Sequence, residues 1–182
     1  MCGITGIFSQ RPVASELYDS IIHLQHRGQD AAGIMTYDKR MHKEKGMGLA
    51  KEVFNKENLQ LLKGNIGISH NRYPTHGGFS HGEVQPFWTS VPYGIALAHN
   101  GNLTNYEDLA KEVTKEETRY LNTTSDSEVL LHLFADHLHQ DAPPQNSEDF
   151  FNLLCEAVTS IFNKVKGAYS VTSIIIGKGL VV

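Results

Sequence analysis

The chain has 182 residues, of which 40% are hydrophobic and 20% charged, and its formal net charge is −4. This length and composition are typical of one globular domain with a sizeable core. The negative charge and the lack of a Lys/Arg cluster argue against nucleic acid or a membrane surface as the main partner and favour a small-molecule substrate.

The first eight residues, MCGITGIF, place a cysteine directly after the initiator methionine. Because the Cys2 side chain is small, removal of Met1 is chemically plausible and would leave a thiol and a free α-amine on one residue. An α-amine has a pKa of about 7.7–8.0 and can act as the base for the thiol. Ile4, Ile7 and Phe8 predict a buried strand that would hold Cys2 rigidly. Cys2 is therefore a candidate N-terminal nucleophile, although a cysteine here can also be accidental.

Further elements follow in chain order. Apolar periodicity predicts a helix over residues 14–25, and Pro12 precedes it as an entry signal. Strand-like runs bounded by Gly, Asn or Pro come next, at 32–37, 46–49, 66–73, 87–89 and 94–99. Three helices are expected at 106–113, 126–139 and 148–164, before a strand-like run at 169–176. This order predicts an α+β fold whose strands are mainly antiparallel.

The last residues, Leu180-Val181-Val182, form an apolar strand-like run without a polar tail. The run predicts either that the sequence stops short of a further domain or that a terminal strand closes a sheet edge, and we favour the first interpretation.

Cys2 and Cys155 are the two cysteines of the chain. A disulfide between them would consume the candidate nucleophile, so we expect a reducing, cytoplasmic location, in agreement with the lack of a signal peptide or a long apolar span. Cys155 lies in an apolar, helix-like run, which predicts a buried side chain.

Arg72 ends the predicted strand at 66–73. Strand alternation places His70 and Arg72 on one face. Pro74 cannot continue a ladder, and the THGG segment at 75–78 indicates a flexible loop. Arg72 could therefore overhang a pocket covered by a flap and bind a carboxylate there, the alternative being a surface ion pair.

Asn100-Gly101 follows the strand at 94–99 and is a strong turn signal. Gly101 tolerates positive φ and lets its backbone N–H face a ligand, while the Asn100 amide adds a second donor, as an oxyanion hole requires. The alternative is an ordinary hairpin turn.

Ser125 and Glu128 have the spacing of a capping box, which predicts a helix that begins at Asp126. The helix dipole favours ionised Asp126, which could bind an ammonium group or only complement the dipole. A thiol with two donors, Arg72 and Asp126 together match the amide, carboxylate and ammonium groups of free glutamine.

Other functions remain open. The ten histidines could indicate zinc, but no HxxxH pair or cysteine pair gives ligand spacing, so we expect no metal. A hydrolase of another amide, such as an acylase, is a second alternative, which a site for a zwitterion disfavours. A sensor that binds glutamine without turnover is a third, and would hold if Met1 were retained and the amine blocked.

Five ordered segments resemble the glutaminase domain of class II, N-terminal nucleophile glutamine amidotransferases: MCGITGIF, QHRGQDAAGI, RYPTHGG, AHNGNLTN and NTTSDSEVLL. Within this class, QHRGQDAAGI, EVQPF, AHNGNLTN and TTSDSE look most like the glutamine phosphoribosylpyrophosphate amidotransferase branch. The His76 of THG is more familiar from the amino-sugar synthase branch, which is the alternative.

The resemblance implies a role for each matching residue. Cys2 would be the nucleophile, Asn100 and Gly101 the oxyanion hole, Arg72 and Asp126 the groups that hold the α-carboxylate and α-amine of glutamine, Thr75 and His76 the flap lining, and Arg27 and Tyr73 supports behind the site.

The fold implied is an αββα four-layer sandwich of two mainly antiparallel sheets, with residues 1–182 forming the glutaminase domain. In the family, ammonia passes to a C-terminal phosphoribosyltransferase domain, absent here, and converts phosphoribosyl pyrophosphate into phosphoribosylamine for de novo purine synthesis. The resemblance implies glutamine as substrate, no metal or organic cofactor in this domain, and a homo-oligomeric full-length enzyme.

Overall fold

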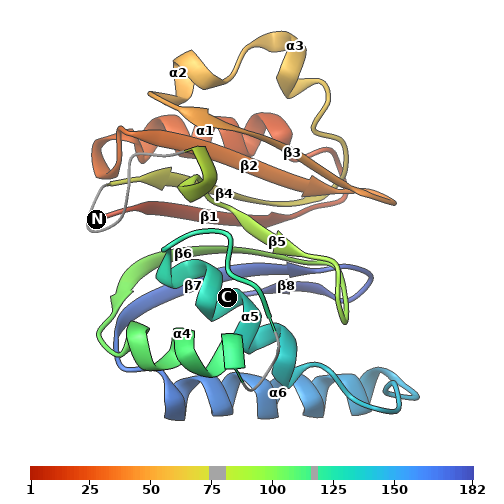
Figure 1. Ribbon diagram of the computed structural model, residues 1–182. Helices are drawn as coiled ribbons and strands as arrows, with labels where there is room; N and C mark the ends of the chain where they lie inside the picture. Colours follow the sequence, from red (N-terminus) through yellow and green to blue (C-terminus); the bar gives the residue numbers. More distant parts are fainter. Residues whose placement is uncertain (74–80, 116–118) are drawn as a thin grey trace.

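The computed structural model describes residues 1–73, 81–115 and 119–182. Two four-stranded antiparallel sheets lie face to face, and helices cover both outer sides (Figure 1). The expected α+β architecture with four layers, αββα, is thereby confirmed.

The first sheet has the strand order β1-β4-β2-β3. Its strands are β1 (Gly3–Phe8), β2 (Ala31–Tyr37), β3 (Met41–Met47) and β4 (Ile66–Arg72). The helices on this side are α1 (Ala14–His23), α2 (Ala50–Val53) and α3 (Lys56–Leu59), with a 3₁₀ turn η1 (Gln25–Arg27) after α1. Leu17 and Ile21 of α1 are buried in one cluster with Ile34 of β2. Their helical spacing places both on one face of α1, which explains why the helix packs flat against the sheet.

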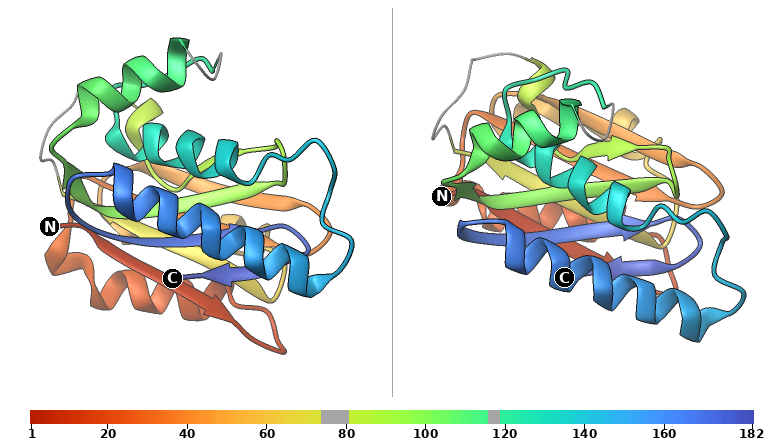
Figure 2. Two further views of the ribbon diagram at one scale, coloured as in Figure 1. Left: turned by 90° about the horizontal axis from the view of Figure 1, so that it is seen from below. Right: turned by 60° about the horizontal axis from the view of Figure 1, so that its bottom comes forward.

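The second sheet has the strand order β5-β6-β7-β8. Its strands are β5 (Phe87–Thr89), β6 (Ile95–Leu103), β7 (Gly167–Ile175) and β8 (Gly179–Val181). Its outer layer consists of α4 (Tyr106–Lys115), α5 (Asp126–His137) and α6 (Ser147–Lys164) (Figures 1 and 2). A 3₁₀ turn η2 (His81–Glu83) precedes β5. The apolar run at 180–182 contributes the edge strand β8, beside β7.

Side chains of β6 alternate between the two faces of the second sheet. Ala96 and Ala98 pack in the cluster between the sheets, together with Ile68 of β4. Ile95 and Leu97 belong to the cluster under the helices. This alternation fixes which side chains at the far end of β6 reach the functional site.

Two expectations about local structure are wrong. Asn100 and Gly101 do not form a turn, because β6 continues through them and pairs with Ser170 and Tyr169 of β7. A full-length pairing with β7 overrides the local turn preference, and the strand ends at Leu103. The third strand was expected at 46–49 and lies at 41–47. Its sequence, MHKEKGM, is mostly polar and shows no alternation of apolar and polar residues that would predict a strand.

Cys155 is exposed rather than buried. It belongs to α6, in which Phe151 and Phe162 are also exposed, at 62% and 75%. Apolar residues of α6 occur on more than one face of the helix, so the sequence pattern does not indicate which face packs on the sheet. Within the described part of the chain, no helix is long and apolar enough to cross a membrane.

Candidate active site

A cavity of about 680 Å³ opens where the two sheets end on the same side of the molecule. Its wall includes Cys2 before β1, Arg72 and Tyr73 at the end of β4, Gly101 of β6 and Asp126 at the start of α5. Cys2, Arg72, Gly101 and Asp126 were predicted to contact one substrate, and the fold brings these distant positions together in one cavity. Tyr73 was predicted as a support behind the site and lies instead in the cavity wall.

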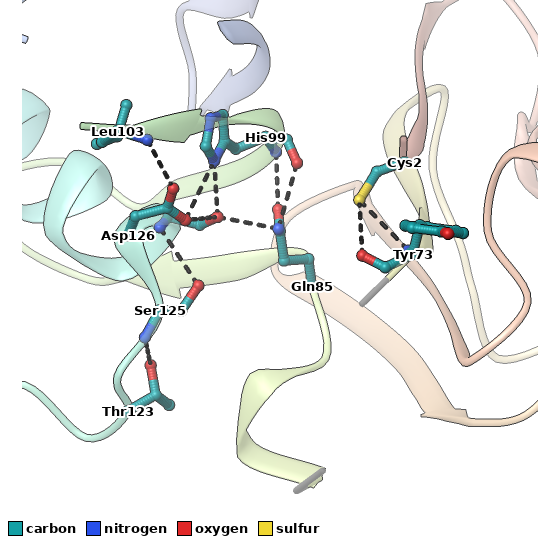
Figure 3. A network of polar contacts seen from close by, with 9 residues as sticks. Cys2, Tyr73, Gln85, His99, Leu103, Thr123, Ser125 and Asp126 are labelled. Atoms are coloured by element: carbon teal, nitrogen blue, oxygen red, sulfur yellow. Dashed lines mark hydrogen bonds and ion pairs between the residues drawn. The ribbon is translucent and has the colours of Figure 1, made fainter. Parts of the chain in front are cut away.

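The Cys2 thiol lies at the end of β4. The backbone N–H of Tyr73 donates to Sγ over 3.4 Å, and the thiol approaches the Tyr73 carbonyl oxygen at 3.8 Å (Figure 3). Burial raises the pKa of the Cys2 thiol, and the Tyr73 backbone and the positive charge of Arg72 counter this only in part. The thiol is therefore protonated at neutral pH, and its use as a nucleophile requires a base.

Arg27 supports the backbone of Cys2 rather than its thiol. The Nε of Arg27, in η1, donates a 3.1 Å hydrogen bond to the carbonyl oxygen of Cys2. Arg27 lies outside the cavity wall. Its predicted place behind the site therefore agrees with the geometry.

Asp126 opens α5 as predicted, with Ser125 as the N-cap residue. One carboxylate oxygen, Oδ2, accepts a 3.1 Å hydrogen bond from the backbone N–H of Leu103. The other, Oδ1, lies 3.6 Å from Nδ1 of His99 and accepts from the Ser127 hydroxyl at 3.3 Å. Burial raises the pKa of Asp126, but the His99 ring and the Leu103 amide outweigh it and lower the pKa below its usual value. An anion is thus maintained in the cavity wall.

A buried polar network behind Asp126 was not predicted. The carboxamide of Gln85 accepts from the backbone N–H of His99 at 2.7 Å, and its Nε2 donates to the His99 carbonyl at 3.2 Å and to Ser127 Oγ at 2.9 Å. All three residues are 7% exposed or less. The motifs EVQPF and TTSDSE contain Gln85 and Ser127, but periodicity alone does not show that they meet.

The predicted capping box does not form. Glu128 accepts hydrogen bonds of 2.7 to 3.0 Å from the backbones and side chains of Asn122 and Thr123, instead of reaching back to Ser125. Burial raises the pKa of Glu128, but hydrogen bonds from His132, Asn122 and Thr123 outweigh it and lower the pKa to about 2. This carboxylate anchors the loop that leads into α5.

The predicted flap residues Thr75 and His76 lie outside the described residues. In η2, which follows them, Glu83 is buried and accepts hydrogen bonds from the backbone N–H and hydroxyl of Thr124 at 3.1 and 3.2 Å. Both residues lie in the cavity wall. The Glu83 carboxylate therefore ties the segment before β5 to the loop before α5.

The backbone of β6 faces the cavity with alternate N–H groups. In an antiparallel strand, the N–H groups of residues 99, 101 and 103 project from the same edge. At residue 99 the group donates to Gln85, and at residue 103 it donates to Asp126. The N–H of Gly101 lies on that edge between them, and Gly101 is in the cavity wall.

Position 101 has room only for glycine. A Cβ there would lie 2.4 Å from the Ala168 carbonyl oxygen and 2.6 Å from the Tyr169 Cα. Asn100 is not in the cavity wall. By alternation, its side chain lies on the face of Ala96 and Ala98, which is turned toward the first sheet.

No group of three or more His, Cys, Asp or Glu residues within 1–73, 81–115 and 119–182 could hold a metal ion. His70, one of the histidines that suggested zinc, is fully buried in β4, and burial lowers its pKa to about 3.

Comparisons with known proteins agree with this geometry. A family model described as a glutamine amidotransferase domain matches residues 70–174. Amidophosphoribosyltransferases of Pseudomonas aeruginosa and Escherichia coli are 48% and 46% identical over 100% of this chain. The enzyme of Saccharomyces cerevisiae is 43% identical over 99% of it. In each case the match covers 36% of the relative, so the chain spans about a third of their length.

Two solved structures have the same fold. The structure of an allosteric regulatory enzyme of purine biosynthesis has a TM-score of 0.78 and 31% identity over 96% of this chain and 35% of its own. The glutamine phosphoribosylpyrophosphate amidotransferase of B. subtilis, complexed with ADP and GMP, has a TM-score of 0.76 and 30% identity over the same shares. The matched family model, the identity to these relatives and the shared fold show that this chain belongs to the glutamine amidotransferase domain family.

Proposed function

We propose that this domain hydrolyses glutamine to glutamate and ammonia, with Cys2 as the nucleophile. The observation that carries the proposal is the cavity whose wall contains Cys2, Arg72 and Asp126. A thiol, a cation and an anion around one cavity fit the amide, α-carboxylate and α-ammonium of glutamine. An N-acyl substrate has no ammonium group for Asp126, which disfavours an acylase.

Arg72 and Asp126 select a zwitterion. A guanidinium binds a carboxylate through two parallel hydrogen bonds, and Arg72 ends β4 in the cavity wall. We propose Thr75 and His76, which follow Arg72 in the sequence, as further contacts of the glutamine. The lowered pKa of Asp126 maintains its charge at neutral pH, as an ammonium partner requires.

The chemistry begins with removal of Met1, which places the α-amine on Cys2. The amine takes the thiol proton as Sγ attacks the carboxamide carbon. It returns a proton to the departing nitrogen as the C–N bond breaks, so that ammonia leaves and a γ-glutamyl thioester remains. Water, deprotonated by the same amine, then attacks the thioester, which yields glutamate and regenerates the thiol. These steps use no metal and no organic cofactor.

The negative charge that develops on the carboxamide oxygen needs donors. The N–H of Gly101 points from the cavity edge of β6, and by alternation the Asn100 side chain lies on the face turned toward the first sheet. We assign these two groups to the oxyanion hole, in which each donor contributes a factor of about 10² to 10³ in kcat.

The full-length protein would use the ammonia. Its named relatives are amidophosphoribosyltransferases, and this chain spans 36% of their length. We therefore propose a further phosphoribosyltransferase domain in which ammonia displaces pyrophosphate from phosphoribosyl pyrophosphate and gives 5-phosphoribosylamine for purine synthesis. A cytoplasmic location is part of the same proposal, since a free catalytic thiol suits a reducing compartment. That the full-length enzyme is a homo-oligomer is an expectation from the family resemblance alone.

The test is glutamate release from glutamine, after intact-mass measurement establishes that Cys2 is the first residue. Turnover that Cys2→Ala abolishes, with an unchanged circular dichroism spectrum, supports the proposal. Glutamine binding without turnover by a Met-free protein would instead identify a sensor, and more than a percent of activity in Cys2→Ala would refute Cys2 as the nucleophile.

A further inference from the structure

Gln85 continues the pairing of β5 with β6 by means of its side chain. Phe87 pairs with Leu97, so the same antiparallel register extended by two residues sets Gln85 opposite His99. The carboxamide of Gln85 accepts from the His99 N–H at 2.7 Å and donates to the His99 carbonyl at 3.2 Å (Figure 3). A carboxamide has the donor and acceptor of a peptide group. It therefore supplies the last rung of the ladder beyond the end of β5.

The backbone of Gln85 is itself fixed on the first sheet. Lys45 of β3 donates through Nζ to the carbonyl oxygens of Val84 and Pro86, on both sides of Gln85. On β2, a Cβ at Gly33 would lie 2.0 Å from the Gln85 carbonyl oxygen, so only glycine allows this close approach. The Gln85 side chain thus connects a rigid base on the first sheet to the strand that carries the proposed oxyanion donors.

The pairing of Gln85 with His99 lies two residues along β6 from the backbone N–H of Gly101. On the cavity edge of β6, residue 99 is held by Gln85 and residue 103 by Asp126, with Gly101 between them. We infer that Gln85 is a positioning residue for the oxyanion hole, because its pairing with His99 sets the direction of the Gly101 N–H. This inference rests on the proposed function and adds to it a residue that acts through β6 rather than on the substrate.

A second branch of the Gln85 amide leads to the substrate ammonium site. Nε2 also donates to Ser127 Oγ at 2.9 Å, and Ser127 donates to Asp126 at 3.3 Å. Loss of this branch would weaken glutamine binding, whereas a displaced oxyanion donor would slow the chemical step. The two effects therefore separate as KM against kcat.

The decisive variant is Gln85→Met in the full-length protein, which retains the length of the side chain and removes both amide groups. We expect kcat per folded protein to fall about 10- to 100-fold, less than the loss of a whole oxyanion donor. The affinity for glutamate γ-semialdehyde, whose carbonyl forms a tetrahedral adduct with the thiol, should fall by the same factor. KM for glutamine should rise no more than in Ser127→Ala, because Gln85→Met also removes the bond to Ser127, whereas the oxyanion donor itself acts in the transition state.

Two further variants serve as controls for Gln85→Met. Gln145→Met changes an exposed glutamine in the loop before α6 and should leave kcat, KM and aldehyde affinity unchanged. Ser127→Ala removes the branch toward Asp126 and should mainly raise KM. The inference would be overturned if Gln85→Met had the kcat and the aldehyde affinity of the wild type. It would also be overturned if kcat fell only because less of the protein was folded, while the affinity for the aldehyde stayed unchanged. An inactive wild-type protein would instead overturn the proposed function.

Discussion

The guanidinium of Arg27 and the carbonyl oxygen of Cys2 are joined by a hydrogen bond of 3.1 Å from Nε. A residue on the turn after α1 thereby holds the backbone of the proposed nucleophile, whose thiol lies in the cavity wall. The contact spans 25 residues of sequence and connects η1 to the residue directly before β1. Its direction indicates a role in orienting Cys2 and no role in binding glutamine.

Arg27→Lys should therefore lower kcat and leave KM for glutamine nearly unchanged. Lysine retains the charge but lacks the Nε donor, and a nucleophile misplaced by about 1 Å costs up to about 10²-fold in rate. Steady-state glutaminase kinetics would measure both constants. Arg11→Lys, at an exposed arginine paired with Glu16, is the matched control. A rise in KM without a fall in kcat would show that Arg27 contacts the substrate instead.

The pH profile of kcat/KM should report the α-amine of Cys2. Burial raises the pKa of the thiol, so the α-amine, a group with a pKa of about 7.7–8.0 in model peptides, must lose its proton for the reaction to begin. The rate should rise with pH as the amine loses its proton and then level off. A value of kcat/KM that does not change between about pH 6 and pH 9 would contradict the amine as base.

Asp126→Asn should weaken glutamine binding more than it slows turnover. An ionic anchor of this kind contributes about 1.5–3 kcal/mol, or roughly 10- to 100-fold in KM. Because the pKa of Asp126 lies below its ordinary value of 3.8, KM of the wild type should stay constant from neutral pH to about pH 5. Asp141→Asn, in the exposed loop after α5, provides the control. An unchanged KM would refute the ammonium anchor.

Features set by short-range chemistry were predictable from the sequence. Asp126 begins α5 because Ser125 precedes it as an N-cap and an apolar run follows. Arg72 ends β4, as the proline two positions later in the sequence predicts. The predicted positions of Asp126 and Arg72, together with Cys2 near the N-terminus, were enough to predict one site for a zwitterion that carries an amide.

Features set by contacts between distant segments were not predictable. Asn100-Gly101 has a strong turn preference, yet nine residues of β7 pair with β6 and hold the pair in a strand. The same pairing leaves the Gly101 N–H on the edge of β6 that faces the cavity, so a backbone donor is available there without the turn that the sequence predicts. Gln85 meets His99 across 14 residues through side-chain atoms, which no local pattern encodes.

Glu128→Gln should destabilise the protein at neutral pH by about 1–3 kcal/mol, because the amide nitrogen would face the N–H and hydroxyl donors of Asn122 and Thr123. The pKa of Glu128 is lowered from 4.5 to about 2, so its contribution to stability is complete above about pH 4.5 and is lost as the pH falls toward 2. Urea unfolding at pH 7 and pH 3 should therefore show a smaller difference between wild type and variant at pH 3. Glu156→Gln, at an exposed position of α6, should show no difference at either pH. A gap of equal size at both pH values would mean that the hydrogen bonds of the loop do not depend on the charge of Glu128.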